Sequence, residues 1–259
     1  MMLRTLCLIW SCKIVLGVII IRKFTEPKNE FEVDFIEPPE LQSERKVSIL
    51  TILKSKEFWQ IFFISFTFKF YGQYVYGSFK TLGARGIPDD AFLSMIGSVG
   101  ALSASLGRIF WTTMMDYFSF KSIYWILFVI QVVTNILIEP MVYYKWIYGV
   151  IVSLSVMTEG CMGSICVALS LKVFGPRRGA EVFSYLFASF GTQSILGSFF
   201  VSAFQYDIGY TGMFIIALCI TLISGILVYN FDEDHKFDYH NALEEQHHHA
   251  KLYALKSLT

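Results

Sequence analysis

From Trp146 to Leu171 the chain reads WIYGVIVSLSVMTEGCMGSICVALSL, an apolar run with one charged side chain, Glu159. The hydrocarbon core of a bilayer is about 30 Å thick, and a helix that rises about 1.5 Å per residue crosses it in roughly 20 residues. The run is long and apolar enough for that crossing. It therefore predicts a membrane-spanning helix with a carboxyl group near its middle.

Six further segments of similar character surround this run. Their approximate bounds are 3–21, 58–82, 91–115, 122–142, 182–204 and 211–230. Glycine, proline or acidic residues stand in the later connections, and no proline falls in the middle of a segment. The pattern predicts an all-α, multi-pass integral membrane protein with about seven transmembrane helices.

The composition indicates that lipid surrounds the chain and that nucleic acid is not a partner. Hydrophobic residues make up 54% of the sequence and charged residues 16%, which is too apolar for a soluble domain of 259 residues. The formal net charge at pH 7 is zero, so no excess of basic side chains exists to neutralise phosphates. We therefore expect the lipid bilayer, and no nucleic acid, around this protein.

The cysteines and histidines argue against an enzyme. All five cysteines lie in apolar segments, where a free cysteine behaves as a small hydrophobic residue, and none forms a close CxxC pair. All five histidines follow residue 234, so no apolar segment holds the histidine ligands or bases of a metalloenzyme or hydrolase. The histidine tract at 247–249 is typical of a solvated tail. We expect no enzymatic activity, no cofactor and no metal.

Lysine and arginine predict the orientation, because loops rich in these residues stay in the cytoplasm. The polar stretch 22–56 is the richest in them. If that stretch is cytoplasmic, the alternation of helices places Lys121 and a cluster of cations near 172–178 on the same side. The C-terminus is then cytoplasmic as well.

This orientation gives four parts. We expect a membrane helix at 1–22, a cytoplasmic loop at 23–57, six helices at 58–230 and a cytoplasmic tail at 231–259. The first segment is open to a second interpretation as a signal peptide. Lys13 and the lack of a small-residue cleavage site favour a spanning helix instead.

Three places in the sequence resemble the second half of a major facilitator superfamily transporter, in its monocarboxylate transporter and oxalate/formate antiporter branch. The first leads from Ala91, Phe92 and Leu93 through Ser98 to Gly107 and Arg108, the second is the loop from Trp111 to Lys121, and the third is Phe174–Arg177 before Ser184, Tyr185 and Leu186. The resemblance implies that 58–230 is a six-helix half-bundle and that 23–57 joins two halves. The helix at 1–22 would be the sixth helix of a truncated N-terminal half, and a missing half or a second copy would complete the carrier.

The loop after the second helix of such a half usually gates transport, and the resemblance assigns this role to two residues here. Asp116 and Lys121 match the acidic and the last basic position of the family's loop pattern. The loop departs from the pattern where Thr112, Tyr117 and Ser119 replace two glycines and an arginine.

Arg108 is the first candidate for substrate binding. It lies on a helical stripe of small or polar residues, spaced at i, i+3 and i+4, that reads Ser94, Ser98, Ala101, Ser105, Arg108 and Thr112. A guanidinium is always charged and its fork of donors matches a carboxylate. In the resembled families an arginine here binds the substrate carboxylate, so we expect Arg108 and Ser105 to face the solute. The alternative is that Arg108 reaches the cytoplasmic surface or caps a helix end.

Charges on two other segments complete the predicted site, because an ionisable group within a membrane is costly and usually functional. Glu159 either takes up a proton and couples transport to it, pairing with Arg108 when substrate is absent, or it is a static hydrogen-bonded carboxyl. Lys69 lies on a hydrophilic stripe with Gln73, near Tyr76. It either attracts the anion or forms a structural ion pair with Glu159.

The sequence thus predicts a secondary active transporter for a small, monocarboxylate-like organic anion that works by alternating access, with protons as a second partner. Two other interpretations remain. One is a fragment of such a carrier that does not transport, and the other is a seven-helix receptor. The later segments lack the prolines and the acidic-arginine motif that such receptors usually carry.

Overall fold

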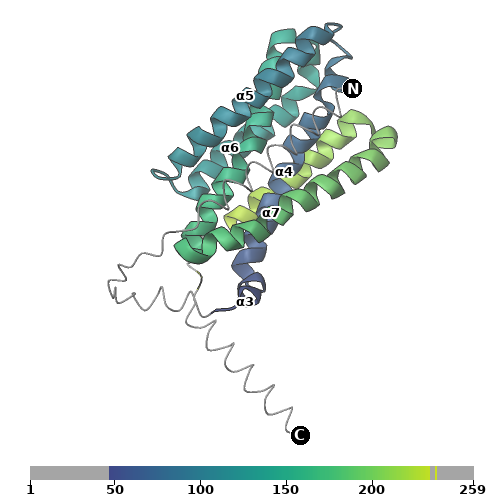
Figure 1. Ribbon diagram of the computed structural model, residues 1–259. Coiled ribbons are helices and arrows are strands. Elements are labelled where there is room, and N and C mark those ends of the chain that lie inside the picture. Colours follow the sequence, from purple (N-terminus) through teal and green to yellow (C-terminus); the bar gives the residue numbers. More distant parts are fainter. Residues whose placement is uncertain (1–46, 234–236, 238–259) are drawn as a thin grey trace, which may run out of the picture. The chain divides into compact units, whose positions relative to one another are not determined.

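Helices make up the regular structure in the computed structural model, which describes residues 47–233 and 237. The elements follow in the order α3 (Ile49–Leu53), α4 (Lys56–Gly83), α5 (Asp90–Met114), α6 (Phe120–Ile138), the short 3-10 helix η1 (Pro140–Tyr143) and α7 (Lys145–Tyr229) (Figure 1).

Two glycines divide α7 into three helices. Gly175 (φ 77°, ψ 168°) and Gly209 (φ 74°, ψ −178°) have backbone angles that residues with a Cβ rarely adopt. The chain turns back at both points, so that α7 consists of helices at 145–174, 176–208 and 210–229 (Figure 1). With α4, α5 and α6, six long helices follow one another between residues 56 and 229.

The expected all-helical membrane fold is confirmed, and each of the six segments predicted after residue 57 is a helix. The segment predicted at 182–204 is a longer helix in the structure, at 176–208. This helix begins at Pro176, and a proline is well tolerated in the first turn of a helix. The predicted helix at 3–21 lies outside the described residues. The predicted domain boundaries at 22, 57 and 230 remain predictions.

Four stretches of the described chain are long and apolar enough to cross a membrane: Asp90–Met114, Phe120–Ile138, Lys145–Gly175 and Arg178–Tyr229. The last has 52 residues and the break at Gly209, so it is long enough to cross twice. The first long helix, α4, is not among the four. It is less apolar because Lys69, Gln73 and several tyrosines lie along it.

Side-chain caps fix where three of the helices begin. Ser55, Asp89 and Ser119 accept hydrogen bonds from backbone N–H groups of the first turns of α4, α5 and α6. Asp89 also forms an ion pair with Lys145, with 2.6 Å between Oδ2 and Nζ. The hydrogen bond from Lys145 holds the pKa of the Asp89 carboxyl below its ordinary value. This pair ties the start of α5 to the start of α7.

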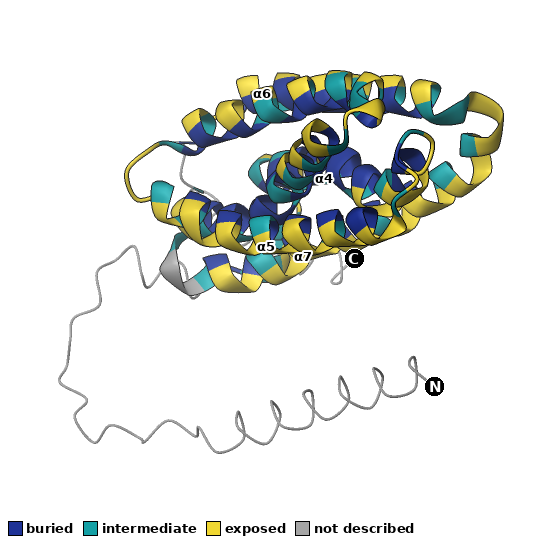
Figure 2. Ribbon diagram, turned by 90° about the horizontal axis from the view of Figure 1, so that it is seen from above, coloured by how far each residue is buried: buried dark blue, intermediate teal, exposed yellow. Residues whose placement is uncertain are grey.

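The bundle is built around α4, which packs mainly against α7 (Figure 2). Its buried residues recur every three or four positions, as the core-facing side of a helix requires; they include Phe58, Ile61, Ile64, Phe68, Tyr71, Val75 and Leu82. α5 and α6 also pack mainly against α7. Exposed residues cover the outer sides of the helices, which is the surface that lipid would contact (Figure 2).

Buried apolar residues form two separate clusters, and polar side chains lie between them. On α4, the first cluster ends at Phe68 and the second begins at Phe70. On the first helix of α7, the second cluster ends at Val156 and the first begins at Cys161. The same division falls between Ala104 and Trp111 on α5. We call the residues at this level the polar layer: Lys69, Arg108, Gln131, Thr134, Asn135, Thr158, Glu159, Ser189, Gln193, Thr221 and Ser224.

Candidate functional site

Three charged residues lie in the polar layer, each on a different helix or helix segment. Lys69 comes from α4, Arg108 from α5 and Glu159 from the first helix of α7. All the other described residues of Lys, Arg, Asp or Glu type stand in the first or last two turns of a helix or outside the helices. The layer therefore holds two cations and one carboxylate, and its formal charge is one positive unit.

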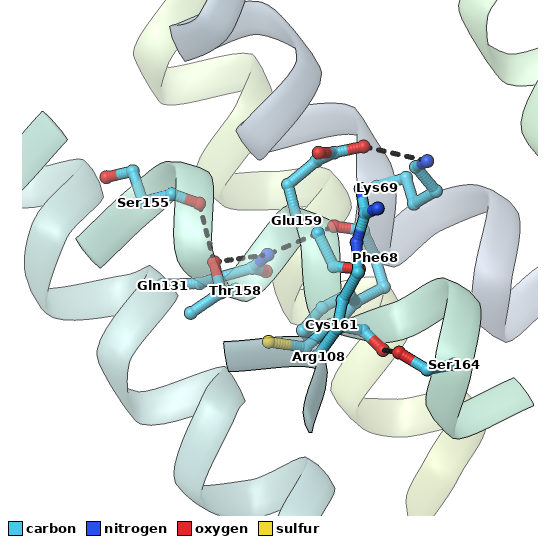
Figure 3. A network of polar contacts seen from close by, with 10 residues as sticks. Phe68, Lys69, Arg108, Gln131, Ser155, Thr158, Glu159, Cys161 and Ser164 are labelled. Atoms are coloured by element: carbon cyan, nitrogen blue, oxygen red, sulfur yellow. Dashed lines mark hydrogen bonds and ion pairs between the residues drawn. The ribbon is translucent and has the colours of Figure 1, made fainter. Parts of the chain in front are cut away.

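Lys69 and Glu159 form an ion pair. Lys69 Nζ lies 2.7 Å from Glu159 Oε1, and their side chains are 15% and 16% exposed. The ammonium also lies 4.4 Å from the ring centroid of Phe190, a cation–π contact from the second helix of α7. Figure 3 shows the two side chains extended toward each other from neighbouring helices.

A glycine brings the two helices close together at this pair. A Cβ added to Gly72 would overlap the Cβ of Glu159 and would lie 3.3 Å from its Cα. α4 and α7 can therefore approach only because residue 72 has no side chain. This approach places Lys69, one turn earlier on α4, within reach of the Glu159 carboxylate (Figure 3).

Arg108 contacts the backbone next to Glu159 rather than its carboxylate. Its Nε donates to the carbonyl oxygen of Gly160 over 3.1 Å. The approach of α5 to α7 is again close, since a Cβ on Gly160 would lie 2.8 Å from the Cβ of Ala104. The carbonyl holds the guanidinium by its Nε, and within the described chain the two terminal nitrogens of Arg108 have no hydrogen-bond partner. In this structure the carboxylate partner is Lys69, so the suggested pairing of Arg108 with Glu159 is not present.

A buried amide lies behind the ion pair, and sequence reasoning missed it. Gln131 on α6 donates from Nε2 to the carbonyl oxygen of Phe68 over 3.2 Å and to Thr158 Oγ1 over 3.3 Å. It thereby links three helices at residues next to Lys69 and Glu159 (Figure 3). The amides of Gln131 and Asn135 within an otherwise apolar run were the signal that was available in the sequence.

The three other predicted binding residues lie on α4 and α5, at different positions from the charged residues. Ser105 is exposed on α5, one turn before Arg108, and its hydroxyl donates to the carbonyl oxygen of Ala101 over 2.9 Å. Gln73 is half-buried and lines a cavity of about 290 Å³ between α4 and the second helix of α7. Tyr76 is 54% exposed and is not part of that lining.

The two predicted gating residues lie together at the connection between α5 and α6, away from the polar layer. Asp116 is exposed in the turn that follows α5. Lys121 is in the first turn of α6, where its backbone N–H donates to Glu233 Oε2 over 3.1 Å. Glu233 is buried and follows the last helix, so this contact joins the end of the bundle to the predicted gating connection.

The polar layer and its six helices lie within a region that matches a known family. The Major Facilitator Superfamily profile matches residues 62–258. No curated protein matches the chain. The match covers most of the sequence and includes every residue of the polar layer, and members of the family are membrane transporters rather than enzymes. The chain belongs to the Major Facilitator Superfamily.

Proposed function

We propose that this protein carries a small monocarboxylate-like anion across a membrane by alternating access and that the anion binds at Arg108 and Lys69. The observation that carries the proposal is the charge of the polar layer. Two cations and one carboxylate leave one uncompensated positive charge between two apolar clusters. Such a charge is costly in a membrane, and a bound mono-anion neutralises it.

Arg108 is the better of the two cations for holding a carboxylate. The Gly160 carbonyl accepts from Nε, which fixes the guanidinium and leaves its terminal nitrogens for a solute. Arg108 and Ser105 lie on the exposed side of α5, where a solute can reach them. A second lobe, supplied by an N-terminal half or by a second copy of the chain, would cover this side and complete the carrier.

The Lys69–Glu159 pair supplies a route to proton coupling. An anion that binds Lys69 competes with Glu159 for the ammonium. The Glu159 carboxylate then loses its partner within the membrane-spanning bundle, where an unpaired charge is costly, and an incoming proton would remove that charge. If Glu159 keeps its charge, the bound mono-anion makes the polar layer neutral. If Glu159 takes up a proton with the anion, the load of anion and proton is neutral and the layer keeps its one positive unit; Lys69 and Glu159 pair again in the empty carrier.

The experiment compares uptake of radiolabelled lactate or pyruvate into proteoliposomes that contain the full chain or its variants. We expect Arg108→Ala to reduce uptake at least tenfold, because it removes the carboxylate fork. Arg108→Lys should retain part of the uptake because it keeps the charge. Lys172→Ala, which removes a cation near a helix end, is the matched control and should transport as the unmodified chain does.

Two results would overturn the proposal. Uptake that is unchanged in Arg108→Ala would remove the arginine from the binding site. Failure of the unmodified chain both to bind and to take up either anion would indicate the non-transporting alternative.

A further inference from the structure

A second feature of the polar layer is a cavity that contains no charged group. It has a volume of about 290 Å³ and lies between α4 and the second helix of α7. Its lining is formed by Phe70, Gln73, Tyr74, Gly77, Ser78, Gln193, Gly197, Ser198, Val201, Ser202 and Gln205. Most of these side chains are amides or hydroxyls, so the cavity offers neutral hydrogen-bond donors and acceptors between apolar walls.

The amide of Gln193 is the strongest sign that this cavity receives a ligand. Gln193 is 1% exposed, and neither its Nε2 nor its Oε1 has a hydrogen-bond partner in the described chain. A buried polar atom without a partner is unfavourable, and native structures rarely keep one without a reason. The hydroxyl of Tyr74, in the same lining, is also buried without a partner.

The backbone makes room for this amide and for a ligand beside it. A Cβ on Gly197 would lie 2.9 Å from Gln193 Nε2, so the amide occupies the space that a side chain there would take. A Cβ on Gly77 would meet nothing within 4 Å, so the cavity wall is open at that residue.

Two amides of the cavity, one on each wall, lie about one helical turn beyond the level of the ion pair. Gln73 follows Lys69 by four residues on α4, and Gln193 follows Phe190, which contacts Lys69, by three residues. Four residues of helix rise about 6 Å and three about 4.5 Å. A solute whose carboxylate sits at Lys69 would therefore reach these amides only with an atom that is several bonds from the carboxyl carbon.

We propose that this cavity is a specificity subsite for an uncharged hydrogen-bonding group, a hydroxyl, oxo or amide group, carried about one helical turn from the carboxylate of the anion. This assignment rests on the proposed function and narrows it. The subsite selects a 4-hydroxy carboxylate over the plain alkyl carboxylate of the same length, because only the former satisfies Gln193 and Tyr74.

The test measures the affinity of the full chain in lipid nanodiscs for butyrate and for 4-hydroxybutyrate, which differ by one hydroxyl. We expect the unmodified chain to bind 4-hydroxybutyrate at least fivefold more tightly. Gln193→Leu should bring the two affinities together while leaving that for butyrate within about twofold, since the carboxylate site is intact. Arg108→Ala should weaken the binding of both.

A glycine pair provides the matched control. Gly77→Val adds a side chain in the cavity wall and should abolish the preference for the hydroxyl. Gly191→Val adds the same side chain on the second helix of α7, also with nothing within 4 Å of the new Cβ, at a residue outside the lining, and should keep the preference.

The possible outcomes test the subsite separately from the proposed anion-binding site. Equal affinities for the two anions in the unmodified chain, or a preference that survives Gln193→Leu, would overturn the subsite and leave the anion site in place. Binding of neither anion would overturn the proposed function and the subsite together.

Discussion

At the scale of single residues, the Lys69–Glu159 pair stabilises the bundle as long as both charges are present. Glu159→Gln leaves the Lys69 ammonium in a site that is only 15% exposed, and Lys69→Met leaves the Glu159 carboxylate alone. We expect each single variant to destabilise the protein by up to about 3 kcal/mol, because one charge is left buried without its partner. The double variant should recover most of that loss. Thermal unfolding in detergent measures all three.

The two single variants and the double variant form a double-mutant cycle, which distinguishes an ion pair from two residues that do not interact. If the ion pair exists, the double variant loses less stability than the two single variants lose when their losses are added. Losses that simply add would mean that Lys69 and Glu159 do not interact in the folded protein.

The sequence identified the three charged residues of the polar layer but not their partners. A charge within an apolar segment is visible from composition alone, because burying it is costly. The partner of Glu159 depends on the distance between helices, and Gly72 sets that distance for α4. Gln193 was missed for the same reason, since an amide without a partner can be recognised only after the surrounding helices are packed.

At the scale of helices, Gly209 allows the turn between the last two helices of the bundle. Its φ of 74° with a ψ of −178° is a conformation in which a Cβ is strained, although a Cβ there would meet nothing within 4 Å. We expect Gly209→Ala to destabilise the protein by about 1–3 kcal/mol through backbone strain alone. Thermal unfolding in detergent checks this value.

Gly191→Ala is the matched control for that variant. Residue 191 is helical and equally open, so an alanine there should be neutral or should stabilise the protein by up to about 1 kcal/mol. Equal effects of the two alanines on stability would show that the backbone conformation of residue 209 does not disfavour a residue with a Cβ.

The helices themselves could be predicted because their signals are local. Apolar length located five of the six segments after residue 57 to within a few residues of their ends, and the prolines and glycines between them indicated the connections. The division of α7 followed the same signals, as Gly175 and Gly209 stand in two predicted connections. The extent of the helix at 176–208 was underestimated because its first turn holds charged residues that hydropathy excludes.

At the scale of the whole bundle, the polar layer separates two apolar clusters at a level that all the long helices cross. In an alternating-access carrier the solute binds near the middle of the membrane, where both sides can reach it in turn. Each of the two apolar clusters packs the helices together on its own side of the polar layer. The layer between them is then free to change its hydrogen bonds when a solute enters.

The six helices also predict on which side of the membrane each connection lies. Lys54, Lys56, Lys121, Lys172, Arg177 and Arg178 stand at one end of the bundle, against Lys80, Arg85 and Lys145 at the other. The first end should therefore be cytoplasmic. When the chain, with its five cysteines replaced, is directed to the plasma membrane, Tyr117→Cys should react with a membrane-impermeant maleimide only after cells are permeabilised, whereas Tyr143→Cys should react in intact cells. Both tyrosines are more than 70% exposed, so access to the reagent depends on the side of the membrane alone. Labelling of residue 117 but not of residue 143 in intact cells would show the opposite orientation. Labelling of both residues in intact cells would mean that α6 does not cross the membrane.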